Sequence, residues 1–188
     1  MDAALIGRLV ALAQRGDRRA ADHLVREHDG WVRSAIYAVV GRPDLVDDIA
    51  QQVWLRVWER LDTLQNPARL RPWLYAIARR TALDMHAEHE RHRSRATSLA
   101  AEAMALEDSP SQRRPPQTLS EREQREALLA AVRGLPAIYR EPLALRHLQD
   151  WSYAEIAELL GISVETVETR LVRARALLRE SLEGRVPC

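Results

Sequence analysis

Residues 151–178 carry the pattern that most constrains this chain, because their caps and apolar residues permit little besides two short helices and a tight turn. The segment reads WSYAEIAELLGISVETVETRLVRARALL. Ser152 and Glu155 form a capping box, which starts a helix. Gly161 suits the left-handed conformation that ends that helix, and Ser163 caps the next one. Helix, turn and helix in this order predict a helix-turn-helix, whose second helix enters the DNA major groove.

The second helix of this segment has two different faces. At about 100° per residue, Val164, Val167 and Leu171 fall on one side and form a buried stripe. Hydroxyls and arginines gather roughly a quarter turn away, and Arg suits DNA because its fork reaches guanine edges or phosphates. The alternative is an ordinary amphipathic helix with solvated arginines, which the spacing of caps and glycine disfavours. The outward residues expected at DNA are Thr166, Thr169, Arg170 and Arg173.

Composition places the chain among soluble proteins of one or two small domains, with 188 residues, 46% hydrophobic and 29% charged. The net charge of +1 does not signal nucleic acid, so DNA binding must come from local placement of arginines. Cys188 is the single cysteine, which rules out a disulfide framework and fits a reducing cytoplasm. Arginines interrupt the N-terminal apolar run, and no stretch approaches the roughly 20 apolar residues of a membrane helix. We therefore expect a cytoplasmic protein without membrane insertion.

Helical periodicity continues along almost the whole chain, and no β pattern appears. Helices are expected at about 18–40, where Gly41 ends the run, at about 43–62, and from Pro72 to about residue 93. Residues 94–119 lose this periodicity and are rich in Pro, Ser and Gln, which is typical of a linker. The expected fold is all-α, with two small helical domains. It comprises an N-terminal bundle of three or four helices in residues 1–93, a flexible linker in 94–119, and a C-terminal four-helix domain with the helix-turn-helix in 120–188.

Residues 69–93 combine an apolar stripe with arginines and aromatic rings, including Trp73, Tyr75, Arg79 and Arg80. Arginine interleaved with exposed aromatics suits single-stranded nucleic acid, because bases stack on the rings and phosphates pair with guanidiniums. A core helix with a solvated basic face explains the same segment at least as well. The pattern alone therefore leaves both interpretations open.

His86, His89 and His92 follow one another at intervals of three in the same helix. This spacing can bring two imidazoles to one metal, but successive steps drift by about 60° around the helix, so all three converge poorly. A solvated or DNA-facing set of histidines is the favoured interpretation, and no metal or cofactor is expected. The sequence shows no pairing of nucleophile and base and no phosphate loop. We therefore expect neither an enzyme nor a small-molecule substrate.

Three segments, in this order along the chain, resemble the extracytoplasmic-function (ECF) sigma factors of bacterial RNA polymerase. The family's polymerase-binding segment is similar to GDRRAADHLVREHDGWVRSAIYAVVGRPDLVDDIAQQVWLRVWERLD, and the helix that recognises the −10 promoter element is similar to PWLYAIARRTALDMHAEHERHRSR. LPAIYREPLALRHLQDWSYAEIAELLGISVETVETRLVRARALLRESL is similar to the domain that binds the −35 element. The last match is highly specific, and the resemblance spans nearly the whole chain.

The resemblance implies roles for particular residues at three surfaces. Core RNA polymerase would be contacted by Asp47, Asp48, Gln51, Gln52, Trp54 and Trp58. A flipped base of the opened −10 strand would be held by Asn66, Trp73, Tyr75, Arg79, Arg80 and Asp84. The −35 major groove would receive Ser163, Thr166, Val167, Thr169, Arg170 and Arg173. For the pair of Trp54 and Trp58, a place in the core is an equally good explanation.

Glu168 departs from the family pattern, which commonly has a basic residue at this position. Helical geometry turns Glu168 roughly opposite Thr166 and Arg170, whereas Glu165 lies nearer their face. Because a glutamate can accept a hydrogen bond from cytosine N4, we expect an unusual −35 preference.

The resemblance as a whole implies an alternative sigma factor, which is a non-enzymatic subunit. Such a protein binds core RNA polymerase and double-stranded and opened promoter DNA, and it directs transcription initiation. An anti-sigma factor is a further partner that the resemblance suggests. A free-standing helix-turn-helix repressor or activator is the first rival, but it would need its own dimerising or sensing domain. An enzyme with a histidine metal centre is the second rival.

Overall fold

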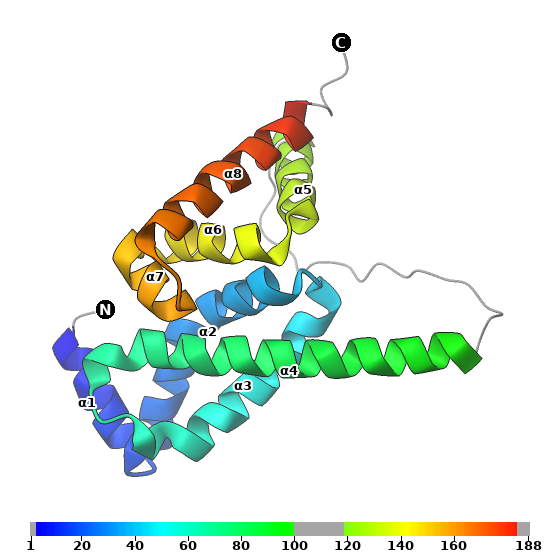
Figure 1. The fold of residues 1–188 in the computed structure, drawn as a ribbon. Coiled ribbons are helices and arrows are strands. Elements are labelled where there is room, and N and C mark those ends of the chain that lie inside the picture. The colour runs from blue at the N-terminus through cyan, green and yellow to red at the C-terminus, as the bar shows by residue number, and fades with distance from the viewer. Residues whose placement is uncertain (1–2, 100–118, 184–188) are drawn as a thin grey trace.

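The computed structural model describes residues 3–99 and 119–183, which form helices joined by short turns (Figure 1). The N-terminal helices are α1 (Ala3–Gln14), α2 (Arg18–Val40), α3 (Val46–Arg60) and α4 (Leu70–Leu99). They are connected by the short 3-10 segments η1 (Pro43–Leu45), η2 (Leu61–Thr63) and η3 (Pro67–Arg69). The C-terminal helices are α5 (Leu119–Gly134), α6 (Ala137–Gln149), α7 (Tyr153–Leu160) and α8 (Val164–Glu183). These two ranges contain no strand, which confirms the expected all-α class.

Helix α2 agrees with the helix predicted at about 18–40 and has a capping residue at each end. The Asp17 carboxylate accepts from the backbone N–H of Arg19 at 2.8 Å and of Ala20 at 3.1 Å. At the other end Gly41 adopts φ 70°, and its N–H donates to the Tyr37 carbonyl at 2.8 Å. Both ends therefore have a partner for otherwise unpaired backbone groups.

Helix α4 is longer than predicted, because it continues past residue 93 to Leu99. Residues 93–99 contain Ala, Arg and Leu, which are good helix formers, and no Gly or Pro. The predicted linker of 94–119 therefore starts inside a helix, and α5 begins at Leu119, the last residue assigned to that linker. The rest of the linker, residues 100–118, lies outside the described residues.

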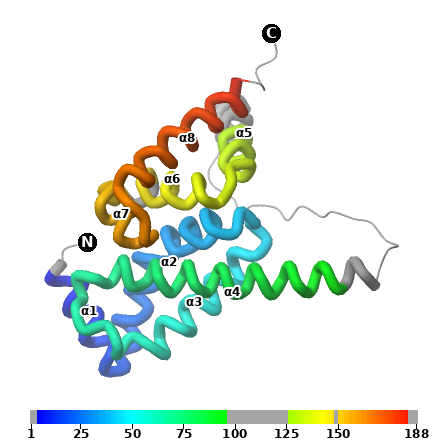
Figure 2. The backbone as a smooth tube through the Cα atoms, in the orientation of Figure 1, coloured from blue at the N-terminus to red at the C-terminus, as the bar shows by residue number. Residues whose placement is uncertain are grey.

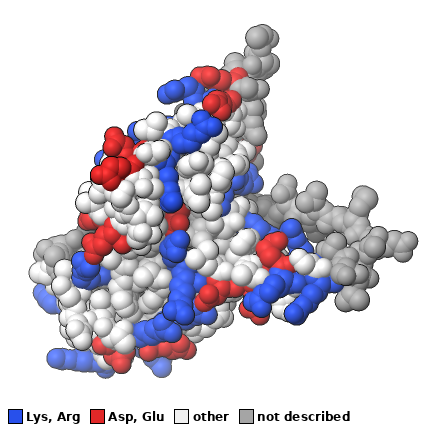
Figure 3. All heavy atoms as spheres, viewed as in Figure 1, with Lys and Arg blue, Asp and Glu red and all other residues white. Residues whose placement is uncertain are grey.

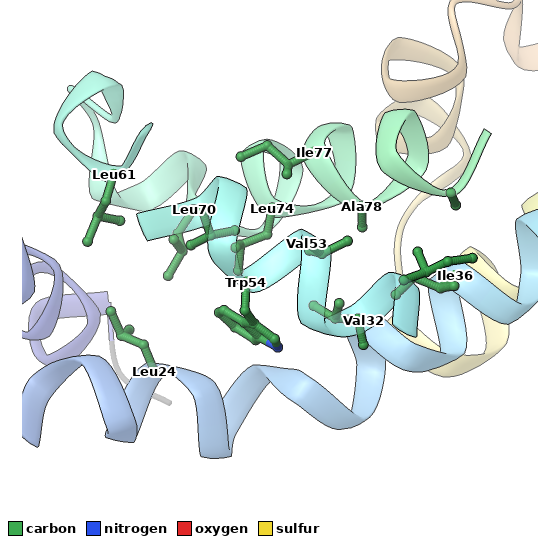
Figure 4. Close-up of a cluster of buried hydrophobic side chains, with 14 of the residues drawn as sticks. Leu24, Val32, Ile36, Val53, Trp54, Leu61, Leu70, Leu74, Ile77 and Ala78 are labelled. Atoms are coloured by element: carbon green, nitrogen blue, oxygen red, sulfur yellow. The ribbon is translucent and has the colours of Figure 1, made fainter. Parts of the chain in front are cut away.

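The N-terminal bundle has a continuous apolar core between α2, α3 and α4 (Figure 4). In that view, side chains from α2 and α3 point toward Leu74 and Ala78 of α4. Each wholly buried aliphatic side chain contributes about 1.5–3 kcal/mol relative to an exposed one. The fully buried members include Val10, Val32, Ile36, Ile49, Val53, Val57 and Leu74.

The C-terminal domain packs α7 and α8 against α6, with α5 lying along α8 (Figure 2). Its core includes Ile156 of α7 and Val167, Leu171 and Ala174 of α8, each with 0% of its surface exposed. The three α8 residues are spaced four and three apart, so they form the single stripe expected of a helix with one buried face. This stripe fixes which face of α8 remains outward.

The two domains also pack against each other, since α6 lies along the C-terminal half of α2 (Figure 1). Ala35 of α2 and Tyr75 of α4 belong to the same buried cluster as Leu143 and Trp151 of the C-terminal domain. The chain is therefore closed, with its helix-turn-helix domain resting on the bundle. No helix of the described ranges has the length and apolar character needed to cross a membrane.

Candidate nucleic-acid interface

The turn between α7 and α8 is built by the caps that the sequence places there. The Ser152 hydroxyl accepts from the Glu155 N–H at 3.3 Å, and the Glu155 carboxylate accepts from the Ser152 N–H at 2.8 Å. The Glu155 carboxylate also accepts from the Ser152 hydroxyl at 2.7 Å, and this hydrogen bond, with the one from the Ser152 N–H, holds the pKa of Glu155 below its ordinary value. Gly161 then takes φ 66°, and Ser163 Oγ accepts from the Thr166 N–H at 3.2 Å. The helix-turn-helix geometry is thus determined locally.

Helix α8 presents a polar surface beside its buried stripe. The hydroxyls of Ser163 and Thr166 lie 3.1 Å apart, and Thr169 donates to the Glu165 carbonyl at 2.8 Å. Of the predicted −35 residues, Ser163, Thr169 and Arg173 are exposed, and Thr166 and Arg170 are half-buried. Hydroxyls and guanidiniums on one side of a helix are the groups that read base edges and phosphates.

Val167 differs from the other predicted −35 residues, because its side chain is wholly buried. It lies in the stripe that packs α8 onto the domain, so its side chain cannot contact a groove in this structure. Val167 therefore anchors the outward residues rather than joining them. Glu165 and Glu168 are both exposed, and hydrogen bonding by the backbone N–H at the helix start lowers the pKa of Glu165.

The predicted −10 residues lie on or just before α4, and their burial and contacts differ. Asn66 caps η3 by accepting from the Ala68 N–H at 3.0 Å, and Trp73 is half-buried against the bundle core. Arg80 and Asp84 are exposed. Tyr75, by contrast, is only 1% exposed. Its place inside the contact between the domains is the main departure from an outward-facing aromatic surface.

An open hollow of about 330 Å³ brings several of these residues together. Arg79, Arg80 and Asp84 of α4 line it, and Leu159 of α7 contributes from the other domain. Its volume lies within the range of sites that hold small organic groups. The remaining lining residues are Tyr75, Ala76 and Leu83.

Helix α3 carries the predicted polymerase-binding residues on two different faces. Asp47, Asp48, Gln51 and Gln52 are exposed, and Asp47 forms an ion pair with Arg33. Trp54, however, is only 9% exposed and donates its Nε1–H to Asp29 at 2.8 Å. It stacks on the half-buried Trp58 with 5.7 Å between ring centroids. The core explanation is therefore correct for Trp54, whose ring is not available to a partner.

The histidine series does not form a metal centre in the described residues, where no group of three or more His, Cys, Asp or Glu side chains could hold an ion. His86 and His89 are half-buried, and His92 is exposed. His92 faces Glu88 one turn earlier, with 3.8 Å between Nε2 and Oε1. The three side chains thus take different environments.

Two exposed leucines belong to these surfaces although sequence reasoning did not select them. Leu55 is 49% exposed and follows Gln51 by four positions, so it shares the polar face of α3. Leu83 is 44% exposed and lines the hollow on α4. The sequence feature that could have identified these two leucines is an apolar residue within an otherwise polar helical face.

On the face shown in Figure 3, arginines form a broken band from the region of α8 toward α4, with acidic side chains beside it.

Comparison with known protein families assigns both halves of the chain. Residues 24–92 match the family model of sigma-70 region 2, and residues 125–178 match that of sigma-70, region 4. A probable RNA polymerase sigma factor RfaY of Xanthomonas campestris pv. campestris is 35% identical over 170 residues, which are 90% of this chain. The alignment spans only 42% of the length of that relative. The ECF RNA polymerase sigma-E factor of Escherichia coli is 29% identical over 181 residues, covering 95% of this chain and 92% of the relative.

Solved structures share the fold. The structure of CnrH in complex with the cytosolic domain of CnrY matches with a TM-score of 0.66 and 27% identity, covering 98% of this chain and 100% of that one. The sigma factor RpoE from Bartonella quintana, solved in complex with the anti-sigma factor NepR, matches with a TM-score of 0.63 and 21% identity over 88% of this chain and 98% of that one. With both sigma-70 regions in order on a shared fold, the chain belongs to the sigma-70 family of RNA polymerase sigma factors, in its ECF group.

Proposed function

We propose that this chain is an alternative sigma factor, which binds core RNA polymerase, recognises −10 and −35 promoter elements and directs transcription initiation. The observation that carries the proposal is the presence of both sigma-70 regions in one chain, each on its own helical domain. Two weak DNA contacts held on one enzyme act at a high effective concentration, so the pair gains an affinity that neither has alone.

In this proposal α8 enters the −35 major groove. The exposed and half-exposed side chains beside the buried stripe would read base edges and phosphates. Support comes from their position at the start of a helix that Ser163 caps and Val167 anchors. The residues assigned to this role are Ser163, Thr166, Thr169, Arg170 and Arg173.

The opened −10 strand would lie on α4, with an unstacked base beside Arg80 and Asp84, which line the α4 side of the hollow. Taking a base out of the stack costs a few kcal/mol, which contacts elsewhere in the complex would offset. Core polymerase would contact the exposed face of α3, where Asp48, Gln51 and Gln52 surround Leu55. A mixed polar and apolar patch of this kind is typical of protein interfaces.

The sigma-70 family consists of transcription factors rather than catalysts, and we propose that this chain likewise catalyses no reaction of its own. We place it in the cytoplasm, because its two proposed partners, core polymerase and promoter DNA, are there. An anti-sigma factor is a further proposed partner, supported by the fold shared with a sigma factor solved in such a complex.

Transcription in vitro tests the proposal most broadly. Purified core RNA polymerase would be combined with this chain and a library of promoter variants, and the 5′ ends of the transcripts would be mapped. We expect starts at a defined distance from a shared pair of elements, and only when the chain is present. Identical transcript ends with and without the chain would refute the proposal.

A further inference from the structure

Two neighbouring residues of α6, Arg140 and Glu141, make the polar contacts at the centre of the boundary between the domains. Both are charged and both are buried, with 7% and 8% of their surfaces exposed. Charged side chains are rarely buried to this extent without partners. Their hydrogen-bond partners therefore show which helices the boundary joins.

The Arg140 guanidinium joins the ends of two helices from different domains. It donates through Nε to the Ala38 carbonyl at 2.8 Å and through Nη2 to the Val39 carbonyl at 3.3 Å, both in the last turn of α2. Nη1 donates to the carbonyls of Arg133 and Leu135, each at 3.1 Å, where α5 ends. Helix C-termini carry partial negative charge, so the cation lies where two such ends meet.

Gly41 makes room for this contact. A Cβ atom at Gly41 would lie 2.5 Å from Nη1 of Arg140, a distance that van der Waals packing forbids. The φ of 70° at this residue also favours glycine. The end of α2 is thus shaped to accept the guanidinium.

Glu141 holds the helix that carries the proposed −10 residues. Its Oε1 accepts from the Tyr75 hydroxyl at 2.5 Å and from Nε of Arg79 at 2.6 Å. The Tyr75 ring also packs against Trp151, with 5.8 Å between centroids. A carboxylate paired with Arg79 occupies the guanidinium that a DNA phosphate would otherwise engage.

A second ion pair between the domains has a different character. Arg69 of η3 and Glu158 of α7 lie 2.8 Å apart, but their side chains are 61% and 66% exposed. Exposed pairs of this kind contribute little to stability, because solvent screens them and both long side chains must be ordered. The buried contacts of Arg140 and Glu141 therefore dominate the polar part of the boundary.

We propose that Arg140 and Glu141 form a latch that keeps the free chain closed, with α6 covering Tyr75 and Glu141 pairing with Arg79 until a partner separates the domains. The closed state itself follows from the contacts above. The regulatory meaning rests on the proposed function, since it requires Tyr75 and Arg79 to bind the −10 strand. A partner opens the latch only by binding the separated domains more tightly than the closed ones.

Distance measurements by electron paramagnetic resonance on the full chain test the latch. Spin labels would be attached to cysteines introduced by Glu59→Cys in α3 and Glu168→Cys in α8, both exposed, in a Cys188→Ser background. We expect one narrow distribution of label distances for the otherwise unchanged chain. Glu141→Ala should add a longer, broad population, because losing a charge-assisted hydrogen bond shifts the equilibrium roughly 10- to 100-fold toward the open state.

The matched control is Glu158→Ala, which removes one carboxylate from an exposed pair between the same domains and should leave the distances unchanged. Tyr75→Phe keeps the ring and removes only the hydroxyl, so it provides a second test should Glu141→Ala fail to fold by circular dichroism. A broad distribution in the unchanged chain, or unchanged distances in both latch variants, would overturn the proposal.

Binding of fluorescein-labelled single-stranded DNA of random sequence and about 12 nucleotides, followed by fluorescence anisotropy, separates the latch from the function. If the latch covers a strand-binding surface, Glu141→Ala should bind this probe several-fold more tightly than Glu158→Ala. Longer label distances without tighter binding would support the latch and reject the assignment of Tyr75 and Arg79 to DNA.

Discussion

Trp54 of α3 donates its indole N–H to the Asp29 carboxylate of α2 at 2.8 Å, which ties the two helices together at the edge of the bundle core. The ring itself is buried and stacks on Trp58. Because one face of α3 is occupied in this way, only the opposite face can meet another protein. That face carries Gln51, Gln52 and the exposed Leu55.

The two faces of α3 should respond differently to substitution. Trp54→Ala should lower the free energy of unfolding by about 3–5 kcal/mol, because it leaves a cavity in the core. Gln51→Ala should change stability by less than about 0.5 kcal/mol but weaken binding to core polymerase. Urea denaturation and co-elution with core polymerase check both effects. Loss of polymerase binding only with loss of folding would contradict the surface assignment.

The loss of DNA binding on replacing an arginine of α8 should depend on the direction in which its side chain points, because every replacement removes the same charge. Arg170 and Arg173 flank Thr166 on the outward face, whereas Arg175 lies about 180° from Thr166 around the helix. Arg170→Ala or Arg173→Ala should reduce holoenzyme binding to a −35 element by about 1–3 kcal/mol. Arg175→Ala, also at an exposed position, is the matched control. Equal losses for all three would show that only net charge matters.

Tyr75 should make the fold sensitive to alkali. Burial, with the charge of Glu141 and its hydrogen bond, raises the pKa of Tyr75 far above its ordinary value of 10.0. In the unfolded chain the hydroxyl ionises near pH 10, so the stability present below that pH is lost as the pH rises above it. The loss should be about 1.4 kcal/mol per pH unit. Tyr75→Phe should show a correspondingly shallower decline in urea denaturation between about pH 10 and 11.

His28 should make the fold sensitive to acid. It is 5% exposed, and neither ring nitrogen has a hydrogen-bond partner in the structure. Burial lowers the pKa of His28 from its ordinary value of 6.5. The unfolded chain therefore takes up a proton first, and stability present above pH 6.5 is lost as the pH falls. His28→Leu should remove this part of the decline, and an unchanged acid slope in that variant would contradict it.

Local features of the fold followed from the sequence, because the residues that determine them are near neighbours. The ends of α2 and the turn between α7 and α8 depend on Asp17, Gly41, Ser152, Gly161 and Ser163, each of which acts within a few positions. Capping interactions between residues a few positions apart can be recognised from the residue types in the sequence. The same holds for Val167 and Leu171 in the buried stripe of α8, whereas Val164, expected in that stripe, lies in the first turn and is 43% exposed.

Contacts between distant segments could not be predicted in this way. Arg140 and Ala38 are separated by 102 positions, and Tyr75 and Glu141 by 66. Each residue, considered in its own helix, is an unremarkable polar or aromatic position. Their burial depends on how the two domains pack, which no local pattern encodes. This is why Tyr75 was expected on an outward surface and is found covered.

Binding of promoter DNA by the full chain, measured by gel shift with and without core RNA polymerase at one salt concentration, distinguishes a sigma factor from a free-standing regulator. We expect weak binding by the chain alone and strong binding, specific for the two promoter elements, once core polymerase is added. Strong, element-specific binding by the chain alone, unaltered by core polymerase, would instead identify a free-standing DNA-binding regulator.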